Sequence, residues 1–102
     1  MEYKLDSAGD KTELIISGRL TFAEHEQCRA ILAELSAAPG GRQVVDLRGV
    51  EFIDSAGLGL LLLLREEAEK NGRNLSLRIP NDGQVKQMLD VSHFQSLIPI
   101  EN

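Results

Sequence analysis

Residues 44–64, VVDLRGVEFIDSAGLGLLLLL, carry the strongest structural signal in the chain. The apolar start at 44–47 predicts a buried strand, and Arg48-Gly49 predicts a turn before residues 50–53. The aliphatic run at 58–64 fits a strand or a helix by periodicity, but unbranched Leu followed by Ala, Arg, Glu and Lys favours a helix. We therefore predict a strand, a loop and a helix, with Ser55 at the start of that helix.

Ser55 supports two interpretations at this position. The first turn of a helix has backbone N–H groups without intrahelical partners, together with a partial positive charge, so a hydroxyl there can cap the helix. The same N–H groups would stabilise a phosphate, and Gly57 and Gly59 would let another molecule approach closely. From the chemistry alone, the simpler interpretation is that Ser55 is the N-cap and that the glycines serve helix–sheet packing.

Composition predicts one domain over residues 1–102, because the chain is too short for two cores and has an ordinary 42% of apolar residues. The net charge of −5, with no run of Lys and Arg, argues against direct binding of nucleic acid or an anionic membrane. The single Cys28 cannot form an internal disulfide, and we interpret it as a buried structural thiol. The aliphatic run is shorter than the ~20 residues that span a bilayer, and the N-terminus shows no signal pattern, so we expect a cytoplasmic protein without membrane insertion.

Before the central stretch, residues 3–6 and 12–17 predict two strands in a hairpin, followed by a tight connection at 18–20. Thr21 and Glu24 have the spacing of a capping box. The helix that they open carries an apolar stripe and ends at residues 39–41. The stripe consists of Cys28, Ile31, Leu32 and Leu35.

After the central helix, Asn71-Gly72 predicts a helix end and residues 75–79 alternate as a half-buried strand. Val85, Met88 and Leu89 predict a short third helix, and residues 96–100 predict a last short strand. The element order is β-β-α-β-α-β-α-β. Since strand–helix–strand units are nearly always parallel, we predict an α/β fold with a mixed sheet of four to five strands and helices mainly on one face.

The sequence offers little for catalysis. Ser55 lies in I-D-S-A-G rather than the G-x-S-x-G of a nucleophile elbow, and His25 and His93 fit surface positions. Gly57 and Gly59 lack the third glycine of a dinucleotide fingerprint, and no phosphate-binding loop occurs. Asp46 lacks the upstream acidic cluster of a phospho-accepting receiver domain. We expect no enzyme activity, no cofactor and no metal site.

Two segments carry a resemblance to a known family. Asp46-Leu47 followed by FIDSAGLG at 52–59, together with Gly18-Arg19-Leu20-Thr21 before the first helix, resembles the signature of STAS domains, the anti-sigma factor antagonist family. The resemblance covers nearly the whole chain and implies the STAS fold. In that family the serine is phosphorylated by a Ser/Thr kinase of the histidine-kinase-like ATPase superfamily, often itself the anti-sigma factor, and a PP2C-type phosphatase reverses this. The matching residue is Ser55, so the resemblance favours phosphorylation over a simple cap.

The resemblance implies a protein-binding switch that, unphosphorylated, binds the anti-sigma factor and releases a sigma factor or related regulator. The alternative is a constitutive scaffold subunit of a lipid-transport ABC complex or a stressosome-like assembly. Two departures are visible, since Ala56 replaces the second hydroxyl that often follows the serine, and many members continue past Ile100 with another helix. The partner-binding surface implied by the resemblance comprises Asp54, Ser55, Ala56, Gly57, Leu58, Arg19, Leu20 and Thr21.

Overall fold

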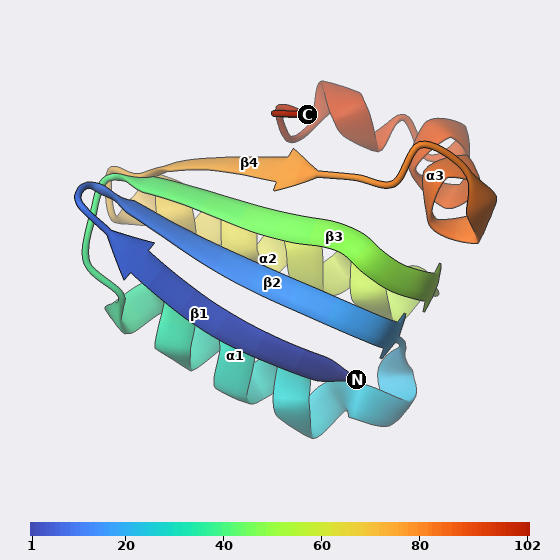
Figure 1. Ribbon diagram of the computed structural model, residues 1–102, viewed down its shortest axis with the longest axis horizontal. Coiled ribbons are helices and arrows are strands. Elements are labelled where there is room, and N and C mark those ends of the chain that lie inside the picture. The colour runs from blue at the N-terminus through green and yellow to red at the C-terminus, as the bar shows by residue number, and fades with distance from the viewer.

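The computed structural model describes residues 1–102, and its sheet has four strands in the order β1-β2-β3-β4 (Figure 1). The hairpin pairs β1 with β2 antiparallel, whereas β2, β3 and β4 run parallel to one another. The predicted hairpin and mixed sheet are therefore confirmed. The strands are β1 (Glu2–Ala8), β2 (Lys11–Leu20), β3 (Arg42–Ile53) and β4 (Asn74–Arg78).

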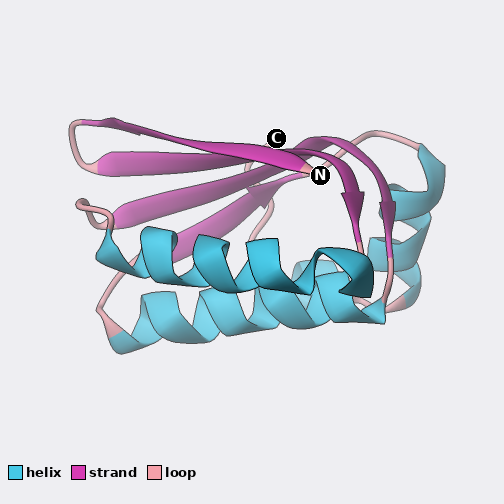
Figure 2. Ribbon diagram, turned by 90° about the horizontal axis from the view of Figure 1, so that it is seen from below, coloured by secondary structure: helices cyan, strands magenta, loops and turns pink.

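Two long helices connect the parallel strands and lie side by side on one face of the sheet (Figure 2). The first, α1 (His25–Ala37), follows a 3-10 turn, η1 (Phe22–Glu24), and the second is α2 (Ser55–Lys70). A third helix, α3 (Gly83–Val91), and a 3-10 turn, η2 (Phe94–Ser96), lie beyond the end of β4 (Figure 1). Helices mainly on one face are the expected arrangement, because both crossovers join neighbouring parallel strands.

The hydrophobic core lies between the sheet and the two long helices. Alternating residues of β2, including Leu14 and Ile16, point into it because successive strand residues face opposite sides of a sheet. The aliphatic run of α2 covers them with Leu61 and Leu64, which confirms that this run is a core helix. The structure has no helix that is both long and apolar enough to cross a bilayer.

The sheet face opposite the helices is covered by ion pairs rather than by a second layer. Arg78 of β4 lies between Glu13 of β2, at 3.3 Å, and Glu101 of the C-terminal tail, at 3.0 Å. Lys11 pairs with the same two carboxylates. Long side chains of this kind shield the apolar positions between them, such as Val44, which is 1% exposed.

Two predictions within the strands were wrong. Arg48-Gly49 is not a turn, because β3 continues through it, and residues 18–20 belong to β2 rather than to a connection. The register of the β2–β3 pair shifts between Ile15 and Ser17, and Gly49 pairs with Ser17 at this shift. If residue 49 had a Cβ, it would lie 3.2 Å from the Cβ of Ser17. Glycine accommodates a bulge in paired strands, and sequence alone does not distinguish such a bulge from a turn.

The predicted last strand at 96–100 was also wrong. The 3-10 turn η2 ends at Ser96, the next residues form no strand, and only Ile100 bridges to Leu77 of β4. The tail still covers the edge of β4, because the N–H of Leu77 donates to the carbonyl of Pro99 and the N–H of Glu101 donates to the carbonyl of Leu77. The predicted helix ends hold: Gly72 adopts a φ of +70° after α2, and α3 contains the expected apolar residues.

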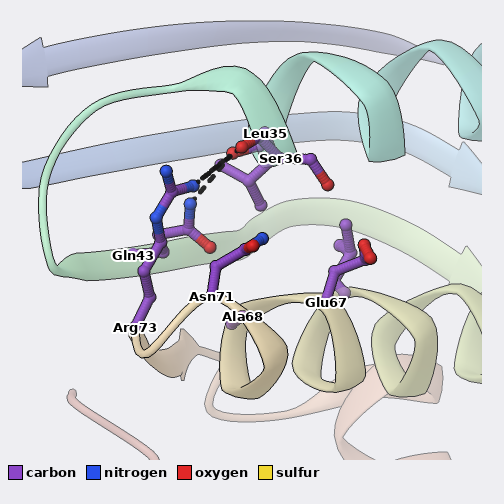
Figure 3. A pocket seen from close by; sticks show the side chains of 8 residues that line it. Leu35, Ser36, Gln43, Glu67, Ala68, Asn71 and Arg73 are labelled. Atoms are coloured by element: carbon purple, nitrogen blue, oxygen red, sulfur yellow. Dashed lines mark hydrogen bonds between the residues drawn. The ribbon is translucent and has the colours of Figure 1, made fainter.

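The C-terminus of α1 is held by side chains from two other elements (Figure 3). Arg73 donates hydrogen bonds from Nη1 to the carbonyls of Leu35, at 3.3 Å, and Ser36, at 3.0 Å. Buried Gln43 donates from Nε2 to the Leu35 carbonyl at 2.9 Å. The last carbonyls of a helix have no N–H partner four residues further on, although that of Leu35 also accepts the N–H of Ala38. A cation is favourable at a helix C-terminus. The space that these residues line holds no water-sized volume, so it is a structural contact and not a ligand site.

Replacing Arg73 should destabilise the fold. The Arg73→Ala variant loses two charge-assisted hydrogen bonds in a half-buried setting, so we expect the free energy of unfolding to fall by about 1–3 kcal/mol. Urea unfolding followed by far-UV circular dichroism measures the change. The matched control is Arg65→Ala, which removes only a surface pair with Glu69 and should cost about 0.5 kcal/mol or less. Equal losses in the two variants would contradict the role of Arg73.

Candidate functional site

The three parallel strands end at one edge of the sheet, and the segments that follow them meet there. Leu20 ends β2 and continues into η1, while Ile53 ends β3 and continues into α2. Gln84 of α3 binds the same edge, since its side-chain amide exchanges two hydrogen bonds of 2.8 Å with the backbone of Ile53. In open α/β sheets, binding sites form outside the carboxyl ends of the strands. Ser55, which comes two residues after Ile53, lies at this edge.

Asp54, not Ser55, caps the start of α2. Its Oδ1 accepts a hydrogen bond from the N–H of Gly57, and its Oδ2 accepts one from the N–H of Phe22, both at 3.0 Å. The N–H of Phe22, with further help from that of Gly57, holds the pKa of the Asp54 carboxyl below its ordinary value, so the group is charged at neutral pH. The interpretation of Ser55 as the N-cap was therefore wrong.

Ser55 is the first residue of α2, and its side chain is exposed. No hydrogen bond within the chain involves its hydroxyl, because Asp54 already satisfies the N–H groups that a capping serine would bind. The hydroxyl is consequently available to another molecule. A group attached to it would lie at the positive end of the α2 dipole.

Gly57 allows the first turn of α2 to pack directly on the end of β2. A Cβ at this position would lie 2.5 Å from the carbonyl oxygen of Leu20 and 2.6 Å from Cγ1 of Ile53. Gly59 is different, because a Cβ there would meet nothing within 4 Å. Gly57 is therefore a packing requirement, whereas Gly59 leaves open space on the surface.

An exposed aromatic side chain lies beside this site and was missed in the sequence. Phe22 is 67% exposed, although its N–H is bound to Asp54, and its ring stacks on that of His25 with 5.0 Å between centroids. Exposed aromatic side chains next to a functional group are typical of protein-binding surfaces. The available signal was a large apolar residue immediately after the capping residue Thr21, outside the apolar stripe of the helix.

The remaining predicted surface residues differ in what they can contact. Thr21 forms the predicted capping box with Glu24, which opens the 3-10 turn rather than α1 directly. The Arg19 guanidinium lies 4.5 Å from the centre of the Phe52 ring, and alternation along the strands directs both side chains away from the helices. The side chain of Leu20 and the whole of Gly57 are buried, so these two residues shape the site without being accessible. Ala56 and Leu58 are half-buried.

The side chains near Ser55 offer no catalytic group to its hydroxyl. His25 uses Nδ1 for a hydrogen bond with the carbonyl of Phe22, not with Ser55. Burial raises the pKa of the Cys28 thiol, and Glu24 and Asp54 raise it further, which disfavours a reactive thiolate. The thiol is half-buried rather than fully buried as predicted. No group of three or more potential metal ligands comes together in the structure.

A family model described as "Mlab, STAS domain" matches residues 3–99. The chain belongs to the STAS domain family. This confirms the resemblance carried by the segment around Ser55. A STAS-domain containing protein of Pseudomonas aeruginosa is 36% identical over 93 residues, covering 90% of this chain and 89% of its own length. BtrV of Bordetella bronchiseptica, named as a candidate anti-sigma factor antagonist, is 28% identical over 102 residues. The match covers 100% of this chain and 87% of the length of BtrV.

Solved structures with this STAS fold include anti-sigma factor antagonists. Unphosphorylated SpoIIAA superposes with a TM-score of 0.77 at 20% identity, covering 99% of this chain and 89% of its own. SpoIIAA of Bacillus in its phosphorylated form superposes with a TM-score of 0.68 at 18% identity, covering 99% and 92%. An anti-sigma factor antagonist of Mycobacterium paratuberculosis superposes with a TM-score of 0.85 at 16% identity, and the match covers 97% of this chain and 83% of that chain. At these identities the likeness establishes the fold of the domain.

Removing the charge of Asp54 should destabilise this STAS domain in a pH-dependent manner. Both carboxylate oxygens of Asp54 accept hydrogen bonds, whereas the amide of Asn has a single acceptor oxygen. We therefore expect Asp54→Asn to lower the free energy of unfolding by about 1–2 kcal/mol at pH 7. The pKa of Asp54 is lowered on folding, so its contribution is present above the unfolded pKa of about 3.9 and is lost as the pH falls through the folded value. The gap between wild type and variant should therefore shrink below about pH 4.

Urea unfolding at pH 7 and at pH 3 measures this gap for Asp54→Asn. The control is Asp82→Asn, because Asp82 occupies the N-cap of α3 without accepting a capping hydrogen bond and should lose little stability. A gap for Asp54→Asn that is the same at both pH values would contradict the electrostatic role of its carboxylate.

Adding one methyl group at Gly57 should have the opposite effect to adding one at Gly59. In Gly57→Ala the new Cβ meets the Leu20 carbonyl, which is backbone and cannot move aside, so we expect a loss of about 1–3 kcal/mol. In Gly59→Ala the methyl enters open space and helix propensity improves, so stability should rise by up to about 1 kcal/mol. Thermal unfolding of both variants tests this, and similar midpoints would contradict the packing of Gly57 on β2.

Proposed function

We propose that this STAS domain is a phosphorylation-gated protein-binding switch with Ser55 as the phosphoacceptor. In its unphosphorylated form it binds an anti-sigma factor that is also a Ser/Thr kinase of the histidine-kinase-like ATPase superfamily, and so releases a sigma factor or related regulator. The observation that carries the proposal is the division of roles at the start of α2. Asp54 caps the helix, and the exposed Ser55 hydroxyl has no partner within the chain.

Phosphorylation of Ser55 would change the charge of this surface by about −1.5 to −2 at pH 7. The helix N-terminus tolerates the added charge in the free protein, because its N–H groups and dipole favour anions. Inside an interface the same phosphate lies next to the charged Asp54 and must lose its water, which is unfavourable. Each 1.4 kcal/mol of lost binding energy weakens affinity about tenfold, so one phosphate suffices as a switch.

The surface around Ser55 is suited to a protein partner. Phe22 offers a large exposed ring, and Ala56 and Leu58 flank the hydroxyl on the first turn of α2. Aromatic anchors surrounded by smaller contacts supply most of the energy in many interfaces. In this proposal the domain acts in the cytoplasm and is not an enzyme, so the kinase and a PP2C-type phosphatase supply the chemistry.

The comparisons support this proposal at the level of the family. One relative and several solved structures with this fold are named as anti-sigma factor antagonists, and SpoIIAA has been solved in both unphosphorylated and phosphorylated forms. Those names describe those proteins. Transfer to this chain depends on the position of Ser55, which occupies the start of α2 with its hydroxyl exposed.

Pull-down from native-host lysate tests the proposal. Wild type, Ser55→Ala and Ser55→Asp serve as baits, and mass spectrometry identifies the bound proteins. We expect Ser55→Ala to capture a histidine-kinase-like Ser/Thr kinase, and Ser55→Asp to bind it at least tenfold more weakly because it adds charge beside Asp54. The purified kinase with ATP should phosphorylate wild type but not Ser55→Ala.

Gln87→Glu is a control for added charge, because Gln87 is also exposed, lies on α3 and makes no hydrogen bond through its side chain. We expect this control bait to capture the kinase as strongly as wild type does. If all baits capture the same transporter or assembly subunits regardless of Ser55, the domain is the scaffold subunit of the alternative interpretation. That result would rule out the switch.

A further inference from the structure

An apolar groove of about 480 Å³ runs between α1 and α2, the two helices seen side by side in Figure 2. Cys28 and Leu32 line it from α1, and Gly59 and Leu63 line it from α2. The groove is open because Gly59 has no side chain and a Cβ there would meet nothing within 4 Å. Leu63 remains 49% exposed in this position. An apolar concave surface of this kind is typical of the sites at which proteins bind ligands or partners.

The groove is continuous with the surface around Ser55. Ala56, the residue after Ser55, lines its near end together with His25. His25 in turn stacks on the exposed Phe22. A molecule bound at Ser55 therefore reaches the groove along the first turns of α1 and α2.

Arg29 gives the groove a charge preference. It lines the groove from α1, and it is the one arginine of the chain that makes no hydrogen bond, ion pair or contact with an aromatic ring. Arg19 lies over Phe52, and the others donate hydrogen bonds to carboxylates or backbone carbonyls. No acidic side chain lines the groove. An occupant with a carboxylate opposite Arg29 would complete this pair.

The walls of the groove determine which backbone conformation fits it. Both walls are helices, whose N–H and carbonyl groups are bonded internally, so the groove can offer no main-chain hydrogen bonds. A strand in an apolar groove of this kind would leave its own backbone groups unpaired, which is unfavourable. A helix satisfies its backbone by itself and inserts apolar side chains at i, i+3 or i+4 and i+7. The occupant is therefore expected to be a helix.

A second copy of the chain does not supply such a helix. The exposed residues of α1 are polar, charged or alanine, and the exposed part of α3 has Val91 as its single large apolar residue. α2 exposes two leucines. Leu63 lines the groove, and Leu62 precedes it in the helix and lies outside the groove. Outside the groove itself, α2 and α3 each expose a single large apolar residue and α1 exposes none, so no second helix face of this domain carries the stripe that an occupant needs, which points to a different protein.

We propose that the groove between α1 and α2 binds an amphipathic helix of the partner protein, with aliphatic side chains against Leu32 and Leu63 and a carboxylate against Arg29. This inference rests on the proposed function, because the helix belongs to the protein that binds at Ser55. It adds a second contact that phosphorylation does not alter.

Site-specific photo-crosslinking tests the proposal. The cross-linking residue p-benzoylphenylalanine replaces Leu63 in the full chain, expressed in the native host, and the linked peptide is identified by mass spectrometry. The control places it at Val91, which is 78% exposed but lies on α3 outside the groove. We expect Leu63 to link to a helical segment of the partner that has an apolar i, i+3 or i+4, i+7 stripe and an Asp or Glu, and Val91 not to link to it.

A charge swap provides the second measurement. Arg29→Glu should weaken binding of the purified partner about tenfold, and replacing the acidic residue of the partner helix by Arg should restore it. Linking of Leu63 to a second copy, to a segment without the stripe, or to nothing above the Val91 background would overturn the proposal. The two proposals fail separately: Ser55→Asp binding like wild type refutes the switch, whereas loss of the Leu63 link alone refutes the groove.

Discussion

One carboxylate, that of Asp54, determines the geometry of the functional edge. Its two oxygens accept hydrogen bonds from the starts of two different segments, Gly57 in α2 and Phe22 in η1. These segments are far apart in sequence, yet both begin at the carboxyl ends of neighbouring parallel strands. A single charged acceptor shared by two N–H donors fixes the distance between them. The position of Phe22 relative to Ser55 therefore depends on Asp54.

Close packing makes this arrangement rigid. Gly57 lets α2 rest on the Leu20 carbonyl, so the helix cannot shift toward or away from the end of β2 without a clash or a gap. The far ends of the same layer are held by Arg73 and Gln43 at the C-terminus of α1. Contacts at both ends therefore hold α1 and α2 side by side. The groove between them is a consequence of this spacing and of the missing side chain at Gly59.

Sequence patterns predicted the elements whose own periodicity determines them. The apolar stripe of α1, the leucines of α2 and the alternation of β4 all reflect burial on one face, which repeats along an element. The errors occurred where contacts with a segment distant in the sequence determine the local structure. Gly49 looks like a turn residue until β2 is beside it, and Ser55 is the better-known cap until the N–H of Phe22 stabilises Asp54 in that role. Phe22 was missed because exposure depends on packing that sequence does not display. The candidate phosphoacceptor was found through the motif, but its free hydroxyl was visible only in the structure.

We expect Ser55 and the groove to have different roles for a thermodynamic reason. A phosphate can release a partner only if the contacts that remain are too weak to hold it at the prevailing concentration. If the groove supplies a few kcal/mol, it binds alone no better than about the millimolar range, while the contacts around Ser55 bring the complex into a useful range. The groove would then contribute orientation and specificity, and the charge at Ser55 would decide occupancy. A much larger apolar surface would defeat the switch, because binding would persist after phosphorylation. The modest size of this groove is thus what a gated interface requires.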